Sequence, residues 1–119
     1  LELGKLSEDY LSDILFNESL NKDYIQLYQV SDCGLAFERS AFNLCLCYSK
    51  AVVNAMKVFI APFAMVLVRV EDREMPLAVG DLECTKRTLV ERIYKAGESS
   101  DSKSFQKWHH RNTLAFQGF

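Results

Sequence analysis

The spacing of apolar and polar residues is clearest in the first thirty positions of the chain. Between Ser7 and Asn21, apolar side chains recur with a helical period, and Ser7 is a favourable residue at a helix N-cap. Residues 24–30 are instead rich in β-forming types, and both faces of that stretch are largely apolar. The pattern therefore predicts a helix followed by a strand from the interior of a sheet.

A turn and a second strand are predicted next. Ser31-Asp32-Cys33-Gly34 is a cluster of turn-forming residues, so we expect the chain to reverse into a strand that begins at Leu35. Across residues 41–48, bulky apolar side chains alternate with asparagine and cysteine. A period of two is typical of a strand, so this stretch is predicted to be another one.

The middle of the chain favours a helix and then a buried strand. Apolar residues between Val52 and Ile60 follow a helical period, Ser49 is a suitable cap, and Pro62 would end the helix. Its β-branched content leaves a long buried strand from Val58 onward as an alternative. Residues 63–70 form an almost unbroken apolar run, which predicts a strand in the middle of a sheet.

A further helix is predicted in the second half. Residues 71–74 form a charged connection and residues 75–80 a short extended piece. Asp81 is a good N-cap for a helix with charged outer faces, and Gly97 suits its end. Residues 97–104 are small and polar, which predicts a mobile loop. For residues 105–119 the pattern leaves helix and strand open.

This order of elements predicts an α+β fold. We expect a single small sheet of three to five mostly antiparallel strands, with two to four helices packed on one face. Residues 1–119 match the length of one domain. Because the chain begins with Leu1 rather than methionine, we also expect it to be excised from a longer protein.

Composition and charge exclude several classes of protein. The 119 residues are 49% hydrophobic and 25% charged, which excludes a disordered tail and a low-complexity linker. Fourteen basic and sixteen acidic side chains give a net charge of −2, so no strong overall field draws the molecule to nucleic acid or to an anionic membrane. Any basic site must therefore be local.

Cysteine usage bears on the cellular compartment. Four cysteines are far fewer than a disulfide-stapled secreted scaffold carries, so we expect reduced thiols. The sequence has neither the pattern of a signal peptide nor the continuous apolar run of a membrane span. These features predict an intracellular protein, in the cytoplasm or the nucleus. The cysteines are Cys33, Cys45, Cys47 and Cys84.

Candidate catalytic chemistry is sparse. Cys45-x-Cys47 is closer than the usual spacing of zinc ligands and lacks a second pair, so buried thiols are the favoured interpretation. The sequence holds no nucleophile elbow and no glycine-rich phosphate loop. A cysteine or serine with His109 or His110 as its base is an alternative, because such residues meet in space. We predict no catalytic, cofactor-binding or metal-binding residues, no cofactor, and no enzymatic activity.

Two binding functions remain, and a non-enzymatic protein–protein interaction domain is the leading one. A high aromatic and aliphatic content can leave anchors on the surface after a core is filled, for a partner protein or for a second copy in a homodimer. The terminal Leu-x-Phe-Gln-Gly pattern also resembles cleavage sites of picornavirus-type proteases. The candidate anchors are Trp108, Leu114, Phe116, Phe119, Tyr24 and Tyr28.

The alternative is a small nucleic-acid-binding module. From Ser102 onward the chain has no carboxylate side chain, while cations accumulate around the lone tryptophan. Cations follow phosphates and aromatic rings stack on bases, so this mixture is typical of single-stranded nucleic-acid surfaces. The candidate residues are Lys86, Arg87, Lys103, Lys107, Trp108 and Arg111.

Overall fold

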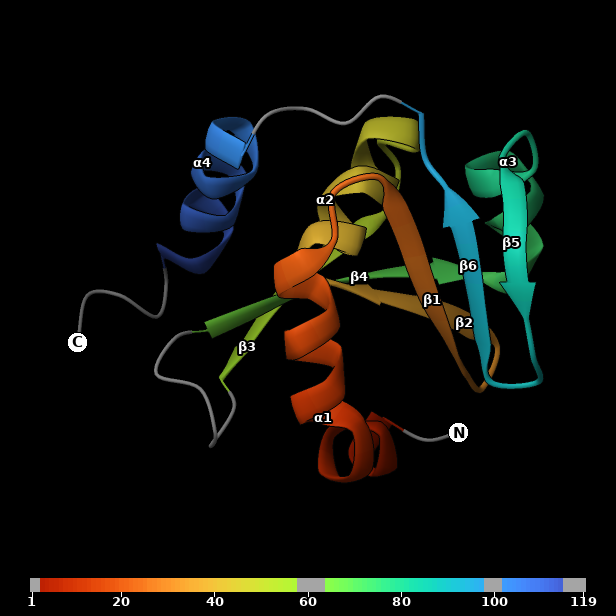
Figure 1. The fold of residues 1–119 in the computed structure, drawn as a ribbon, viewed down its shortest axis with the longest axis horizontal. Helices are drawn as coiled ribbons and strands as arrows, with labels where there is room; N and C mark the ends of the chain where they lie inside the picture. Colours follow the sequence, from red (N-terminus) through yellow and green to blue (C-terminus); the bar gives the residue numbers. More distant parts are fainter. Residues whose placement is uncertain (1–2, 58–63, 98–101, 115–119) are drawn as a thin grey trace.

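The chain begins with a helix and a β-hairpin, as the sequence predicts (Figure 1). The computed structural model describes residues 3–57, 64–97 and 102–114, with side chains from Tyr10 onward. Helix α1 spans Leu3–Leu20, strand β1 Tyr24–Val30 and strand β2 Cys33–Phe37. Val30 lies opposite Cys33, which closes the hairpin through Ser31 and Asp32. The helix, the interior strand β1 and the reversal of the chain are therefore confirmed. The expected starts are wrong, because α1 includes Ser7, the predicted N-cap, and β2 begins at Cys33 rather than at Leu35.

Over the described residues, the fold is α+β, with an open antiparallel sheet of six strands and four α-helices (Figure 1). The strand order is β3-β4-β2-β1-β6-β5, and every neighbouring pair is antiparallel. The expected three to five strands were too few. The remaining elements are α2 (Glu38–Cys47), β3 (Val52–Lys57), β4 (Ala64–Glu71), η1 (Asp72–Glu74), α3 (Met75–Val79), β5 (Glu83–Arg87), β6 (Glu91–Lys95) and α4 (Ser102–Thr113).

Helices cover both faces of the sheet, so the prediction that they pack on one face is wrong. On one face, Ile25 and Leu27 of β1 join a core cluster with residues of α2 and α3. On the other, Tyr28 and Val30 pack in a cluster that includes Ile14 of α1. The interior strands are apolar on both faces, and burying both requires a helix on each side.

Residues 41–48 were predicted as a strand, but most of them belong to helix α2. Ala41 and Leu44 are fully buried and Tyr48 packs against the same core. This i, i+3, i+7 spacing is helical, whereas a strand would place Ala41 on the opposite face from Leu44 and Tyr48. Leu46, which the strand pattern would bury with Leu44, is exposed. The buried positions of this segment therefore follow the helical period, although its bulky residues alternate along the sequence as in a strand.

The helix predicted from residue 50 is also wrong where the structure describes it. Residues 52–57 form strand β3, which pairs with β4 from Val52 opposite Arg69 to Lys57 opposite Ala64. The β-branched valines favour this outcome. The predicted central strand over residues 63–70 is confirmed as β4, which lies between β3 and β2. The alternative strand from Val58 onward falls partly outside the described residues.

The helix predicted after Asp81 is a β-hairpin, formed by β5 and β6. Leu89 is 96% exposed at the turn. Thr88 closes this turn, since its hydroxyl oxygen accepts hydrogen bonds from the backbone N–H groups of Val90 and Glu91. Glu91 forms a cross-strand ion pair with Lys86, at 2.9 Å.

Two short segments also differ from expectation. Residues 75–79 are helical rather than extended, and Pro76 is tolerated because it lies in the first turn of α3. The expected mobile loop over residues 97–104 ends earlier, because α4 begins at Ser102, while residues 98–101 lie outside the described part. Residues 102–113 are helical, which resolves the open choice there. None of the described helices has the length and apolar character needed to cross a membrane.

Candidate interaction surfaces

Buried polar groups join the end of α1 to the start of α2. The carboxylate of Glu18 accepts hydrogen bonds from the backbone N–H and the hydroxyl of Ser40, both at 2.6 Å, and from the Asn21 amide at 3.1 Å. Burial raises the pKa of Glu18 to about 7, against the opposing effect of these bonds and with a smaller contribution from the charge of Glu38. These hydrogen bonds hold the connection between α1 and β1 against the start of α2.

A second buried carboxylate holds α4 in place. Glu38 has a φ of 50°, in the left-handed region that disfavours non-glycine residues. Its carboxylate accepts a 2.9 Å hydrogen bond from the backbone N–H of Val66 and lies 2.6 Å from Nε2 of His109. The side chain of Glu38 thus accepts from a backbone N–H of β4 at the point where β2 has ended and no longer pairs with β4. The same carboxylate also contacts α4 through His109.

The arrangement offers little for nucleophilic or metal chemistry. All four cysteines are free thiols. Cys33 and Cys84 donate to backbone carbonyls, at 3.2 and 3.3 Å, and burial raises the pKa of Cys45 to about 11. Among the described residues, no group of three histidine, cysteine or acidic side chains is placed to hold a metal ion.

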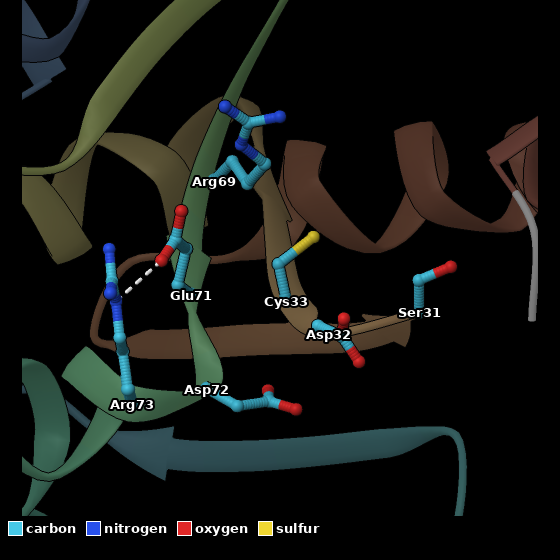
Figure 2. Close-up of a pocket in the computed structure, with 7 residues that line it drawn as sticks. All are labelled: Ser31, Asp32, Cys33, Arg69, Glu71, Asp72 and Arg73. Carbon is cyan, nitrogen blue, oxygen red and sulfur yellow. Dashed lines mark ion pairs between the residues drawn. The ribbon is translucent and has the colours of Figure 1, made fainter.

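A hollow of about 630 Å³ lies at the β1–β2 turn and the end of β4. Figure 2 shows Arg69, Glu71 and Cys33 projecting from neighbouring strands toward the same side. Glu71 forms an exposed ion pair with Arg73 at 2.7 Å, and Asp72 accepts from the Gln29 amide at 3.0 Å. Three acidic and two basic side chains line this hollow, and Arg73 pairs with Glu71 within the lining, so its size alone does not make it a binding site.

A smaller groove of about 330 Å³ has a different character. It runs from the end of α1 across the sheet surface of β1, β6 and β5, and none of its lining side chains is charged. Leu20 is 69% exposed and Tyr24 43% exposed at its rim. We call it the Tyr24 groove; its lining residues are Asn17, Leu20, Asn21, Tyr24, Gln26, Thr85 and Ile93.

Internal hydrogen bonds hold the polar lining of the Tyr24 groove in position. The Asn21 side chain accepts from the backbone N–H of Tyr24 at 3.0 Å and donates to its carbonyl at 2.8 Å. Gln26 donates to the Glu91 carboxylate at 2.8 Å, and the Thr85 hydroxyl donates to the Ile93 carbonyl at 3.2 Å. The groove is therefore preformed rather than dependent on a partner for its shape.

The predicted interaction anchors differ in burial and lie in different parts of the structure. Tyr28 is buried and packs edge-on against Phe37, with ring centroids 5.9 Å apart, so it is a core residue. Trp108 is half-buried against Phe42, at 5.4 Å. Tyr24 lines the groove, and Leu114 is exposed at the end of α4. The remaining two predicted anchors, Phe116 and Phe119, lie outside the described residues.

The predicted basic residues fall into two separate groups. Lys103, Lys107 and Arg111 are exposed on one face of α4. Lys86 and Arg87 lie on β5, and α4 and β5 are at opposite ends of the molecule in the view of Figure 1. The two groups therefore do not form one continuous patch.

Sequence reasoning missed most of the Tyr24 groove. It named Tyr24 but none of the other lining residues as a candidate, and it predicted a helix where β5 and β6 supply Thr85 and Ile93. The groove comes from four elements, and residues 83–95 contribute to it only as a hairpin. The β-branched residues Thr85, Thr88, Val90 and Ile93 were the available signal for that hairpin.

Comparisons with protein-family models, curated proteins and solved structures found no match.

Proposed function

We propose that this chain is a non-enzymatic protein–protein interaction domain, and that the Tyr24 groove receives a bulky apolar side chain from a partner polypeptide. The observation that carries the proposal is the pairing of exposed Leu20 and Tyr24 at the rim of an uncharged groove. Apolar and aromatic anchors seated in preformed concave sites supply much of the energy of protein–protein binding.

The uncharged lining also defines the partner's chemistry. Burying a charged side chain against Leu20, Tyr24 and Ile93 would remove its hydration without an opposite charge to replace it. A neutral segment with one large apolar residue avoids this penalty. The partner is therefore an apolar anchor on a neutral stretch of polypeptide.

A direct test uses blocked amino acids as probes of the groove. Isotopically labelled protein is titrated with N-acetyl-phenylalaninamide and, separately, with N-acetyl-lysinamide, and the backbone amide resonances are followed by NMR. We expect the phenylalanine probe to shift the resonances of Tyr24, Thr85 and Ile93, and the lysine probe to leave them unchanged. Shifts confined to other surfaces, or no shifts, would contradict the proposal.

Two variants of α1 sharpen this test. Leu20→Glu places a charge at the rim of the groove and should weaken the phenylalanine response at least about tenfold, because a charge next to an apolar ligand opposes its desolvation. Phe16→Glu is the matched control: Phe16 is exposed on the same helix, one turn away, and does not line the groove. Equal effects of the two variants would count against a groove-specific site.

The exposed face of α4 supports a second candidate, which is binding to a nucleic-acid backbone. Lys103, Lys107 and Arg111 follow one another at helical spacing, with no carboxylate side chain within α4. Trp108 has its ring packed against Phe42 and is poorly placed to stack on a base. Any such binding would therefore depend on charge rather than on stacking.

Fluorescence anisotropy of a labelled single-stranded oligonucleotide tests this second candidate. Binding through α4 should weaken as salt is raised and should be lost when Lys103, Lys107 and Arg111 are changed together to alanine. The matched control changes Lys86 and Arg87, which lie at the far end of the molecule. Binding that is insensitive to salt, or equally sensitive to both sets of changes, would exclude the α4 surface.

A further inference from the structure

The edge strands of the described sheet, β3 and β5, differ in how they are protected against pairing with another strand. An edge strand presents unpaired N–H and C=O groups, and proteins blunt such edges with bulges, charged residues and short length. Strand β5 has a register shift between Cys84 and Lys86, and it carries charged side chains at Glu83, Lys86 and Arg87. Strand β5 is thus a protected edge.

Strand β3 is less protected, since it has no register shift and a single charged residue. Its six residues pair with β4 without a register shift, from Val52 opposite Arg69 to Lys57 opposite Ala64. Lys57 is its one charged residue and lies at its end. Val52 is 48% exposed, and no strand within the described ranges pairs with the outer edge of β3.

The sequence of β3 is complementary to itself in one particular register. In an antiparallel pair of identical strands related by a two-fold axis, opposed residues must point to the same face of the sheet. Centring the pair on Asn54 puts Val52 opposite Met56 on one face and Val53 opposite Ala55 on the other. Centring it on Ala55 would instead oppose Asn54 to Met56 and Val53 to Lys57. Within residues 52–56, the Asn54 register therefore matches apolar to apolar on both faces and amide to amide at the centre, and Lys57 lies opposite Ala51, just before the strand.

We propose that two copies of this chain associate through β3, paired antiparallel about a two-fold axis at Asn54, so that their sheets join into one. This seam lies at the opposite edge of the sheet from the Tyr24 groove, which reaches Thr85 on β5. The seam and the groove are therefore independent surfaces, and either proposal can fail without the other.

The experiment changes Asn54, because in the proposed dimer this residue lies opposite its own copy on the two-fold axis. Sedimentation equilibrium of the full chain is measured over a range of concentrations for the wild type and for Asn54→Lys and Asn54→Asp, alone and mixed in equal amounts. Asn54 is exposed, so these changes should leave the fold intact, and circular dichroism checks this. Each charged variant should raise the dimer dissociation constant at least about tenfold, because like charges oppose each other at the axis.

Mixing the two variants should restore association, since lysine then lies opposite aspartate. The neutral variant Asn54→Ser and the groove variant Leu20→Glu should both dimerise like the wild type. A wild type that stays monomeric at every concentration would overturn the proposal. Dimers that survive Asn54→Lys and Asn54→Asp, or that the mixture fails to restore, would overturn it as well.

Discussion

At the scale of single residues, buried polar groups fix how the helices meet. Glu18 and Glu38 are both buried, and each carboxylate satisfies a backbone N–H, that of Ser40 or of Val66. A buried donor left without a partner is costly, so the loss of either side chain would affect more than one contact. Burial also raises the pKa of Glu18, which links the fold to pH.

Replacing Glu18 with glutamine should change how stability depends on pH. Burial raises the pKa of Glu18 from 4.5 to about 7, so the folded protein holds a proton there that the unfolded chain releases. Stability from this group is full below pH 4.5 and is lost as pH rises to about 7. We therefore expect the free energy of unfolding of the wild type, relative to Glu18→Gln, to fall by about 3 kcal/mol between pH 4.5 and 7.5.

Urea denaturation at several pH values measures this difference. Glu83→Gln serves as the control, since Glu83 is exposed on β5. Subtracting the variant from the wild type removes the contribution of the other titrating groups, provided that they are unchanged. A difference that stays constant over this pH range would mean that the pKa of Glu18 is the same in the folded and the unfolded protein.

At the scale of elements, α4 is attached through one aromatic face. Phe105 and Trp108 lie 5.7 and 5.4 Å from the ring of Phe42 on α2, and His109 contacts Glu38. The guanidinium of Arg39 lies 5.3 Å from the centre of the Phe105 ring. The opposite face of α4 is exposed and basic. Helix α4 therefore depends on α2 for its position.

Trp108→Ala should destabilise the protein by about 2 to 3 kcal/mol, less than for a fully buried tryptophan because Trp108 is half-buried. The loss comes from its packing against Phe42 and the neighbouring core. Lys107→Ala, on the exposed side of the same turn, should change stability by less than about 0.5 kcal/mol. Urea denaturation followed by circular dichroism compares the two, and equal stabilities would mean that α4 does not pack on α2.

The elements also mark how far the sequence alone could predict this fold. Residues 24–30 and 64–71 were predicted well, because strands buried on both faces need long runs of β-forming apolar residues. Residues 41–48 and 83–95 were not, because each is short enough to fit both a helical and a strand period. Contacts with β1 and β4 favour the helix over residues 41–48, and the pairing of β6 with β1 favours the hairpin over residues 83–95. The Tyr24 groove could not be predicted as a whole, since it depends on that hairpin.

At the scale of the whole molecule, one sheet serves two cores. Alternate residues of β1, β2 and β4 face opposite sides, so Ala36 contributes to the cluster beneath α2 and α3 while Leu35 contributes to the cluster beneath α1. Both clusters contain residues of the same three strands, so unfolding of these strands would disturb both clusters. The two faces should therefore unfold together, as a single cooperative unit.

Leu35→Ala tests this coupling between the two faces. Leu35 is buried on the α1 face, whereas Trp108, the lone tryptophan, packs against the opposite cluster. We expect the variant to lose about 2 to 4 kcal/mol of stability through the cavity that it creates. Its Trp108 fluorescence and its circular dichroism should shift to lower urea by the same amount. If the Trp108 transition stays at the wild-type midpoint while the circular dichroism transition moves, the two faces unfold separately and the shared sheet does not couple them.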